Sequence, residues 1–202
     1  VLDTKLITIP SLARGSIASV LFMAFFAGFM FRLTILLQQG EHIEPLHAGL
    51  VFAPSGVTFA LSSLLMRGWV AMNRQRAIRT GASITILGLV VAALGLTIDG
   101  LPTLGLIVAA VCLTGFGNGL VLPTLIGLAL SDVPPMKAGV GSGIVTAAQQ
   151  FAASGGVALL GTLYFSWAAA AGHQQAMAWT FIADIVLLIG VILVAGLSPD
   201  SR

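Results

Sequence analysis

The sequence predicts an all-α, polytopic membrane protein in which six transmembrane helices form one bundle. The first two observations are compositional: 57% of the 202 residues are hydrophobic, and only 8% are charged. A soluble globular domain carries roughly a quarter charged residues, because its surface must face water. The third observation is that apolar stretches recur that are long enough to cross a bilayer, which takes about 20 helical residues.

Six such stretches extend from near the start of the chain to its end. They cover residues 15–37, 48–66, 80–97, 103–130, 138–166 and 176–197. Residues 1–14 are expected to be a cytoplasmic linker, and residues 198–202 a cytoplasmic tail. The stretches are continuously apolar, which is typical of helices, whereas the strands of a membrane β-barrel alternate in polarity. Two groups of three helices have opposite topology, so the bundle permits a 3+3 inverted repeat.

The basic residues predict the orientation of these helices. With the N-terminus in the cytoplasm, eight of the nine basic residues fall on the cytoplasmic side: Lys5, Arg14, Arg67, Arg74, Arg76, Arg79, Lys137 and Arg202. Because short cytoplasmic loops are rich in Lys and Arg, both termini are expected in the cytoplasm and the chain in a plasma membrane. The isoelectric point of about 9.2 therefore reflects orientation, and no nucleic-acid partner is expected.

Two charged residues lie inside predicted spans. Arg32 is in the first span and Asp184 in the sixth, at similar depths below the outer surface. A single charge in a bilayer costs about 2.5–3.5 kcal/mol on insertion scales, so we expect the two to interact or to line a water-filled cavity. One interpretation is a site of substrate binding or proton coupling. The alternatives are a structural ion pair, or an Arg32 side chain that extends to the outer headgroups.

Three amides are also out of place in lipid. Gln149 and Gln150 lie near the middle of the fifth span, and Asn118 lies in the fourth. Buried amides must be hydrogen-bonded, to neighbouring helices or to a ligand. Adjacent helical residues point about 100° apart, so one glutamine is expected to line a cavity while the other makes a helix contact. All three are candidate cavity residues.

Glycine is concentrated in the fourth and fifth spans, and single prolines lie inside the second and fourth. Small residues let helix backbones approach closely, and proline within a span bends a helix. Static packing and sliding, bendable helices are both compatible with this pattern. The candidate helix-packing residues are Pro54, Gly115, Gly119, Pro123, Gly139 and Gly143.

The sequence contains no recognisable catalytic or cofactor motif. It has no HExxH, P-loop or GxSxG pattern, so no enzymatic activity and no cofactor are expected. His42 and His47 occur with Glu41 and Glu44 in the polar loop after the first span. Their spacing is not diagnostic of a metal site, and we expect a solvated loop there.

Four stretches resemble the C-terminal six-helix half of the major facilitator superfamily, and within it the fourteen-helix drug:proton antiporters. The first is Leu2–Leu6, which is similar to the family's "LDLRLF" linker. The others are LLQQGEHIEPLHAGLVFAP from Leu36 to Pro54, GFGNGLVLPTLIGLALSDVPPMKAGVGSG from Gly115 to Gly143, and TAAQQFAASGGVALLGTLY from Thr146 to Tyr164. They follow the order and spacing of the family's motifs over most of the chain.

Some positions depart from the family pattern. The segment after the second span resembles a degenerate form of the gating motif "GxLADRxGRR", with candidate gating residues Gly68, Arg74 and Arg76. Gln75 stands at a glycine position of that motif, which puts gating through it in doubt. Gln149 stands where arginine is common, and His42 replaces a glycine in the outer loop.

The resemblance implies half of a proton-coupled multidrug efflux transporter that works by alternating access around a central site. Its partners would be membrane lipid, an N-terminal half, a small hydrophobic substrate and protons. Phe22, Phe26 and Phe29 follow i, i+4, i+7 spacing on the first helix and suit an apolar drug, with lipid packing as the alternative. Asp184 would be a candidate proton carrier. Two other functions stay open: a membrane scaffold or assembly subunit that transports nothing, and a six-helix protomer that dimerises.

Overall fold

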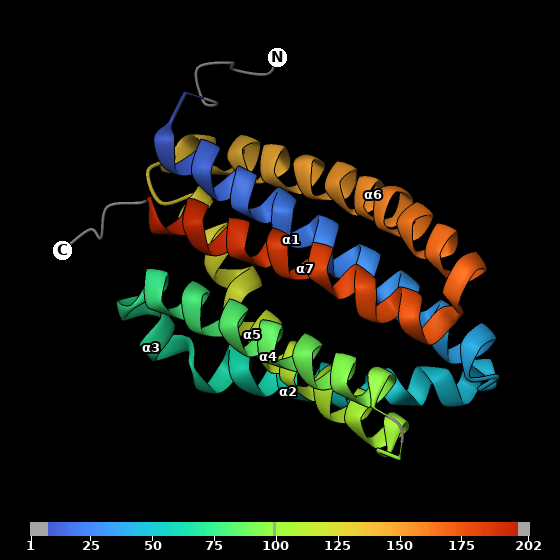
Figure 1. Cartoon of the computed structure of the whole chain (residues 1–202). Helices are drawn as coiled ribbons and strands as arrows, with labels where there is room; N and C mark the ends of the chain where they lie inside the picture. Colours follow the sequence, from blue (N-terminus) through green and yellow to red (C-terminus); the bar gives the residue numbers. More distant parts are fainter. Residues whose placement is uncertain (1–7, 99, 198–202) are drawn as a thin grey trace.

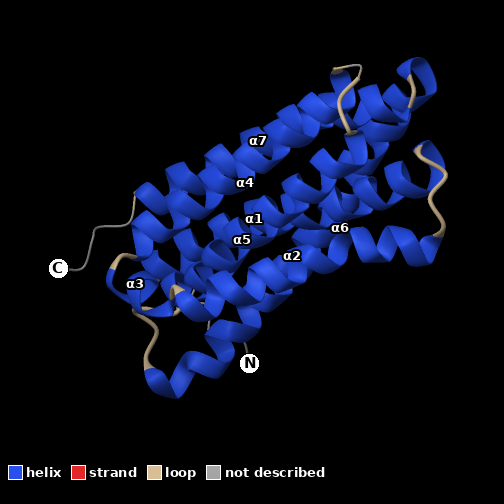
Figure 2. Ribbon diagram, turned by 90° about the horizontal axis from the view of Figure 1, so that it is seen from below, coloured by secondary structure: helices blue, strands red, loops and turns tan. Residues whose placement is uncertain are grey.

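The computed structural model describes residues 8–98 and 100–197, and within them only helices, turns and loops occur (Figure 2). The helices are α1 (Pro10–Ile35), continued by a π-helical turn (Leu36–Gly40), α2 (Pro45–Leu65), α3 (Arg67–Met72), α4 (Arg74–Thr97), α5 (Thr103–Ala129), α6 (Ala138–Ala171) and α7 (His173–Gly196). A short 3₁₀ turn (Pro135–Lys137) precedes α6. All of these helices except α3 are long and apolar enough to span a membrane, and they match the six predicted spans.

The predicted spans are shorter than most of the helices. α1 begins at Pro10, inside the predicted linker, and α4 begins at Arg74 where the prediction placed a loop. α6 continues to Ala171, and α7 starts at His173 after Gly172, whose positive φ of 86° turns the chain. Hydropathy finds the part of a helix that crosses lipid, whereas the polar first and last turns form without an apolar signal. The motif Leu2–Leu6, Asp99 and the predicted tail lie outside the described residues.

α1 lies between α6 and α7 in one part of the bundle, and α5 packs on α2 and α4 in the other (Figure 1). α1 packs along α6 and α7, α5 packs along α2 and α4, and α4 also contacts α7. α2 and α6 make almost no contact with each other and are the least buried of the long helices. They therefore lie at opposite edges and leave broad faces unpartnered within this chain.

The helix contacts have the symmetry of two inverted three-helix repeats. Exchanging α1, α2 and α4 for α5, α6 and α7 converts the α1–α6 contact into α5–α2 and the α4–α5 contact into α7–α1. The α1–α5 and α4–α7 contacts map onto themselves, while the α6–α7 contact has no strong counterpart. The predicted 3+3 organisation is thus present in the packing although no sequence repeat is visible.

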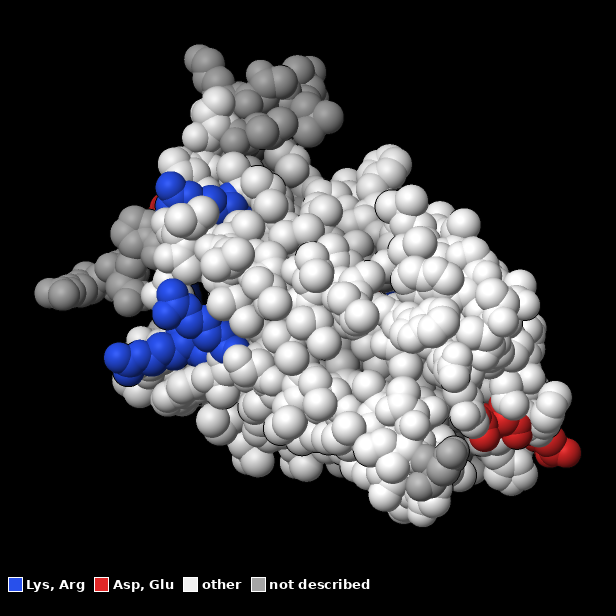
Figure 3. All heavy atoms as spheres, in the orientation of Figure 1, with Lys and Arg blue, Asp and Glu red and all other residues white. Residues whose placement is uncertain are grey.

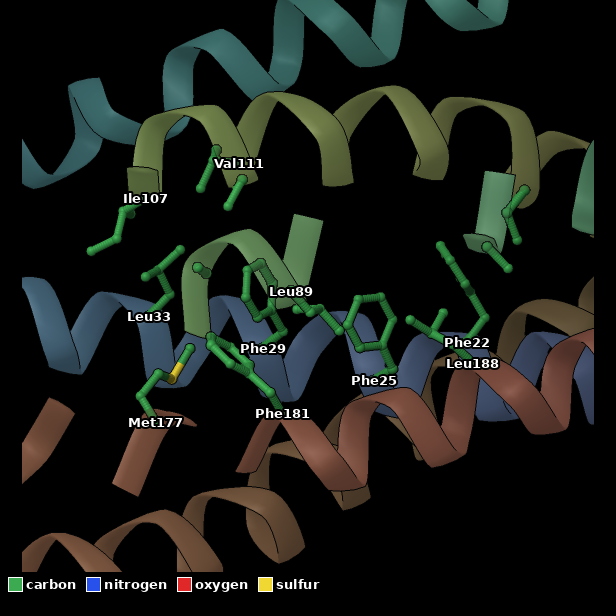
Figure 4. Close-up of a cluster of buried hydrophobic side chains, with 14 of the residues drawn as sticks. Phe22, Phe25, Phe29, Leu33, Leu89, Ile107, Val111, Met177, Phe181 and Leu188 are labelled. Atoms are coloured by element: carbon green, nitrogen blue, oxygen red, sulfur yellow. The ribbon is translucent and has the colours of Figure 1, made fainter. Parts of the chain in front are cut away.

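The hydrophobic core lies between α1, α4, α5 and α7. Figure 4 shows Phe25 and Phe29 of α1 pointing into this space, with Leu89 of α4 and Phe181 of α7 beside them. The rings of Phe25 and Phe29 are 5.9 Å apart between centroids, and those of Phe29 and Phe181 are 6.3 Å apart. Such contacts add about 0.5–1.5 kcal/mol per pair beyond the burial of the rings.

Glycine brings α1 and α6 into close contact. A Cβ added at Gly156 of α6 would lie 2.6 Å from the Cα of Ala24, and one at Gly28 of α1 would lie 3.0 Å from the carbonyl oxygen of Gly156. Real Cβ atoms essentially never approach as closely as the first distance, and the second is tighter than most real Cβ contacts. The α1–α6 contact therefore depends on the absence of a Cβ at both positions.

The α2–α5 contact uses two of the predicted packing glycines. Gly115 lies against Ser55 and Thr58, and Gly119 lies against Phe59 and Ser62. The hydroxyl of Thr58 donates a 2.9 Å hydrogen bond to the carbonyl oxygen of Cys112, across the two helices.

Two other predicted packing residues, Gly139 and Gly143, do not make tight contacts inside this bundle. Gly139 and Gly143 have no atom within 4 Å of an added Cβ, so the interpretation as packing residues is wrong for contacts within the chain. Both lie in the first turns of α6, where the helix faces outward. Pro54 and Pro123 lie inside α2 and α5, half-exposed and exposed respectively.

Charge is divided between the two ends of the molecule. Lys and Arg gather at one end of the face in Figure 3, where a small acidic patch is also visible, and the larger group of Asp and Glu lies at the other end. We call them the basic end, where α1 begins and where α3 and the start of α4 lie, and the acidic end, formed by Gly40–Glu44 and Gly172–Gln175. Arg14 at the start of α1 donates a 3.0 Å hydrogen bond to the carbonyl oxygen of Leu197, which joins the first and last helices at the basic end.

Candidate functional site

Arg32 of α1 and Asp184 of α7 form a fully buried ion pair. Nη2 of Arg32 lies 2.6 Å from Oδ1 of Asp184, and both side chains have zero exposure. The Nε of Arg32 donates to the carbonyl oxygen of Gly28 at 2.9 Å, so its side chain runs back along α1. The predicted interaction of the two charges is confirmed. Extension of Arg32 to the headgroups is excluded, because the side chain points into the bundle.

The ion pair leaves two buried polar atoms without a protein partner. Nη1 of Arg32 and Oδ2 of Asp184 make no hydrogen bond to any described residue. An arginine and a carboxylate often form two parallel bonds, but here Nε is used by Gly28 and only one contact remains. Buried polar atoms are almost always satisfied, and a water molecule between a donor and an acceptor is the usual solution. The site is therefore suited to hold water or a small polar group.

Tyr164 and His173 form a second polar contact, between α6 and α7 near the acidic end. Tyr164 of α6 has zero exposure, and its phenol oxygen lies 2.8 Å from Nδ1 of His173, the first residue of α7. Sequence reasoning missed both residues, because an isolated Tyr near the end of an apolar helix is ordinary and its nine-residue separation from His173 matches no motif.

The two glutamines point in different directions, as adjacent helical positions require. Gln149 is buried, with only 8% of its surface exposed, and its Nε2 has no partner among the described residues. Gln150 is exposed on α6. Asn118 is buried between α5 and α4, where its Oδ1 accepts a 3.3 Å hydrogen bond from the hydroxyl of Thr85. Asn118 is thus engaged within the bundle, whereas Gln150 remains free to meet another molecule.

The phenylalanines are placed differently from the prediction. Phe22 and Phe29 are 0% and 1% exposed and belong to the core between α1, α4, α5 and α7. Only Phe26 is partly exposed, stacked on Phe22 at 6.2 Å. An i, i+4, i+7 spacing identifies residues on one face of a helix, but it does not show whether that face contacts protein, lipid or a cavity. Here it meets the neighbouring helices, so Phe22 and Phe29 offer no surface to a cavity.

The predicted gating segment is helical and lies at the basic end. Gly68 is in α3, while Arg74 and Arg76 are in the first turn of α4, and all three are exposed. Gln75, which stands at a glycine position of the family motif, donates a 2.9 Å hydrogen bond to the carbonyl oxygen of Gly196. This bond ties α4 to the end of α7. A glycine could not make it.

Comparison with known proteins identifies the family. A profile described as Major Facilitator Superfamily matches residues 4–157, which is more than half of the chain. The chain belongs to the major facilitator superfamily. Its six helices and their inverted-repeat contacts are those of one six-helix half of the superfamily's fold.

Several curated members of the superfamily are similar to this chain. A "Probable actinorhodin transporter" of Streptomyces coelicolor is 32% identical over 76% of the chain and 27% of that protein. A "Lincomycin resistance protein" of Streptomyces lincolnensis is 31% identical over 92% of the chain and 38% of that protein. The "Drug efflux pump JefA" of Mycobacterium tuberculosis is 28% identical over 84% of the chain and 33% of that protein. The chain therefore spans less than half the length of these relatives.

Proposed function

We propose that this chain is the C-terminal half of a proton-coupled multidrug efflux transporter that works by alternating access. The observation that carries the proposal is the family membership together with relatives whose names specify antibiotic transport, antibiotic resistance or drug efflux. Transporters of this kind expose a site between two halves to one side of the membrane at a time. Membrane transport, and not catalysis, is the activity that the family implies.

The unpartnered faces of α2 and α6 support a missing N-terminal half. These are the least buried long helices, and α6 exposes the amide of Gln150 in the middle of its length. An amide facing lipid would lack hydrogen bonds, whereas a polar cavity between two halves would satisfy it. We assign Gln150 to the wall of that cavity, and the exposed small residues Gly139 and Gly143 to contact with the other half.

The Arg32–Asp184 pair supports proton coupling in this half. Asp184 is an acid buried within the bundle, with a fixed positive charge at 2.6 Å and one carboxylate oxygen free of protein partners. A carboxylate in lipid whose second oxygen is available can take up and release a proton. In the proposed mechanism Asp184 carries the coupled proton, and Arg32 holds the deprotonated carboxylate in place.

The division of charge supports the orientation. The basic end carries exposed Arg67, Arg74, Arg76 and Arg79, while the acidic end carries glutamates. The excess of positive charge on cytoplasmic loops then assigns the basic end, and with it both termini of this half, to the cytoplasm of a bacterial inner membrane. The acidic end faces outward.

The proposal is tested by efflux from cells that express the full-length gene. Cells are loaded with ethidium and energised, and the loss of fluorescence is followed with and without a proton-gradient uncoupler. We expect active export that the uncoupler abolishes. Export that persists in the uncoupler would contradict proton coupling.

A correctly inserted protein that exports none of a panel of dyes and antibiotics would overturn the efflux function and favour a scaffold. A six-helix product that exports drugs by itself, as a dimer on crosslinking, would replace the missing half with a second copy. Membrane insertion is checked by fractionation in every case.

A further inference from the structure

An open apolar groove of about 450 Å³ runs between α6 and α7, with α1 as its floor. α1 lies between the other two helices (Figure 1) and contributes Val20 and Ala24 to the groove. Gly155 and Leu159 belong to the α6 wall, and Val186 belongs to the α7 wall. All the residues that line the groove are apolar, so their side chains offer an occupant no hydrogen bond.

The groove is closed toward the acidic end and open toward the basic end. At the acidic end Gly172 joins the two walls, and the rings of Trp167 of α6 and Trp179 of α7 meet edge to face with their centroids 5.9 Å apart. Toward the basic end the walls have different neighbours. The first turns of α6 pack on the end of α5, whereas Gly196 at the end of α7 accepts a hydrogen bond from Gln75 of α4.

The groove opens onto an apolar outer surface. Beyond the first three residues of α7, the exposed residues of that helix are all large and apolar: Trp179, Ile182, Val186, Ile189 and Leu193. On α6, the exposed wall residue Leu159 is nine residues from Gln150, which places the two on opposite sides of the helix. The groove therefore faces lipid, away from the side of α6 that we assign to the cavity between the two halves.

A cation lies at the open end of the groove. Ile17 is three residues before Val20 and Arg14 is three before Ile17, so each lies beside the next on the surface of α1. Ile17 is 52% exposed, and Arg14 is partly exposed about 9 Å along the helix from Val20. The apolar floor thus leads directly to a positive charge.

The guanidinium of Arg14 is suited to bind a phosphate group. Its hydrogen bond to the carbonyl oxygen of Leu197 occupies one of the five N–H donors of an arginine, and the fork of the others matches phosphate oxygens. Within residues 8–98 and 100–197, no carboxylate forms an ion pair with Arg14. Its charge is therefore not neutralised by an acid of the described chain.

We propose that the groove binds one acyl chain of an anionic phospholipid whose phosphate contacts Arg14. The order of the site, a cation at the basic end followed by a purely apolar channel, is the order of the groups in such a lipid. A chain can end at the tryptophan pair, whereas a helix of the other half would have to pass the closed end. The lipid fills the space between α6 and α7, and this role goes beyond drug transport.

The test uses phosphatidylglycerol with a photoactivatable diazirine in its acyl chain. Full-length protein is placed in phosphatidylcholine liposomes that contain the probe, and labelled peptides are identified by mass spectrometry after irradiation. We expect label on the peptides that contain Leu159 and Val186, and about fivefold less from the same probe with a choline headgroup. Arg14→Gln should also lower the phosphatidylglycerol label about fivefold, the effect of one basic residue near anionic lipid. Arg67→Gln, at an exposed arginine of α3, is the charge-matched control.

A second variant fills the groove and leaves Arg14 unchanged. An added Cβ at Gly155 meets nothing within 4 Å, so Gly155→Leu extends into the groove without displacing a neighbour. It should lower the label about tenfold. Gly105→Leu adds the same side chain to α5, where a Cβ meets only Pro102 at 3.8 Å, and should leave the label unchanged. Thermal unfolding of each variant separates loss of the site from misfolding.

Three results would overturn the proposal. Equal labelling with both headgroups, unaffected by Arg14→Gln, would reduce the groove to ordinary contact with the bilayer. An unlabelled groove in the wild-type protein would mean that another occupant, such as a helix of the other half, covers it. Label displaced by ethidium and not by unlabelled phosphatidylglycerol would make the groove a dye site. The labelling needs no transported substrate, so its outcome is independent of the efflux experiment.

Discussion

Arg32 and Asp184 meet at 2.6 Å although 152 residues separate them, and neither side chain has any exposed surface. The pair joins α1 to α7, which lie side by side in the bundle (Figure 1). Each charge makes the other tolerable in an apolar environment. Removing one charge leaves the other buried without a partner, whereas removing both charges leaves no buried charge.

The first prediction is a strong non-additivity at this pair. Arg32→Leu and Asp184→Leu should each destabilise the protein by about 3–5 kcal/mol, because each leaves an uncompensated buried charge. The double variant should be closer to the wild type than either single one. Thermal unfolding in detergent, monitored by circular dichroism, measures all three, and Arg76→Leu at an exposed site is the control. Additive losses would mean that the two charges do not support each other.

The second prediction compares neighbouring glycines of α6. Gly156→Ala should cost about 1–3 kcal/mol, because its Cβ would collide with the Ala24 backbone and separate α1 from α6. Gly155→Ala is the matched control: an added Cβ meets nothing within 4 Å, and alanine favours helix by about 1 kcal/mol. Unfolding midpoints of the two variants should move in opposite directions. Equal midpoints would show that α1 and α6 are not in close contact at Gly156.

The third prediction concerns His42, which stands where the resembling family has glycine. Its φ of 55° is left-handed, a conformation that costs a non-glycine residue about 1–2 kcal/mol. His42→Gly should therefore stabilise the loop and raise the unfolding midpoint. His47→Gly should lower it by up to about 1 kcal/mol, because His47 lies within the first turn of α2. A lower unfolding midpoint in both variants would contradict the left-handed conformation of His42.

The fourth prediction separates the adjacent glutamines. Gln149→Leu should leave stability unchanged or raise it slightly, because it removes a buried amide nitrogen that has no partner. Gln150→Leu should leave stability unchanged but alter drug efflux by about 2–10-fold, the effect of one hydrogen bond lost in the cavity. Resistance profiles in cells expressing the full-length protein provide the measurement. Normal efflux of every drug by Gln150→Leu would remove Gln150 from the cavity.

The fold could be predicted from the sequence because lipid imposes one demand throughout. Backbone groups in a bilayer must be satisfied within a helix, so six long apolar stretches allow little else. The need to pair polar groups in lipid also predicted the Arg32–Asp184 contact. Two opposite charges at the same depth reduce the free-energy cost of placing each in the bilayer. The ends of the helices were predicted less well, because the first turns at Pro10 and Arg74 lie outside the continuously apolar stretches that hydropathy detects.

The candidate site was predicted only in part, because the direction of a side chain depends on its neighbours. The spacing of Phe22 and Phe29 identified a helix face, but only the packing of α4, α5 and α7 against it made that face the core. Tyr164 and His173 carried no signal of their own, since their relation exists only after α6 and α7 are folded against each other. The sequence alone therefore determined the class of environment and the number and approximate extent of the helices. The tertiary structure decided which polar atoms meet and which remain unpaired, because those contacts depend on helix rotations and separations that no local pattern fixes.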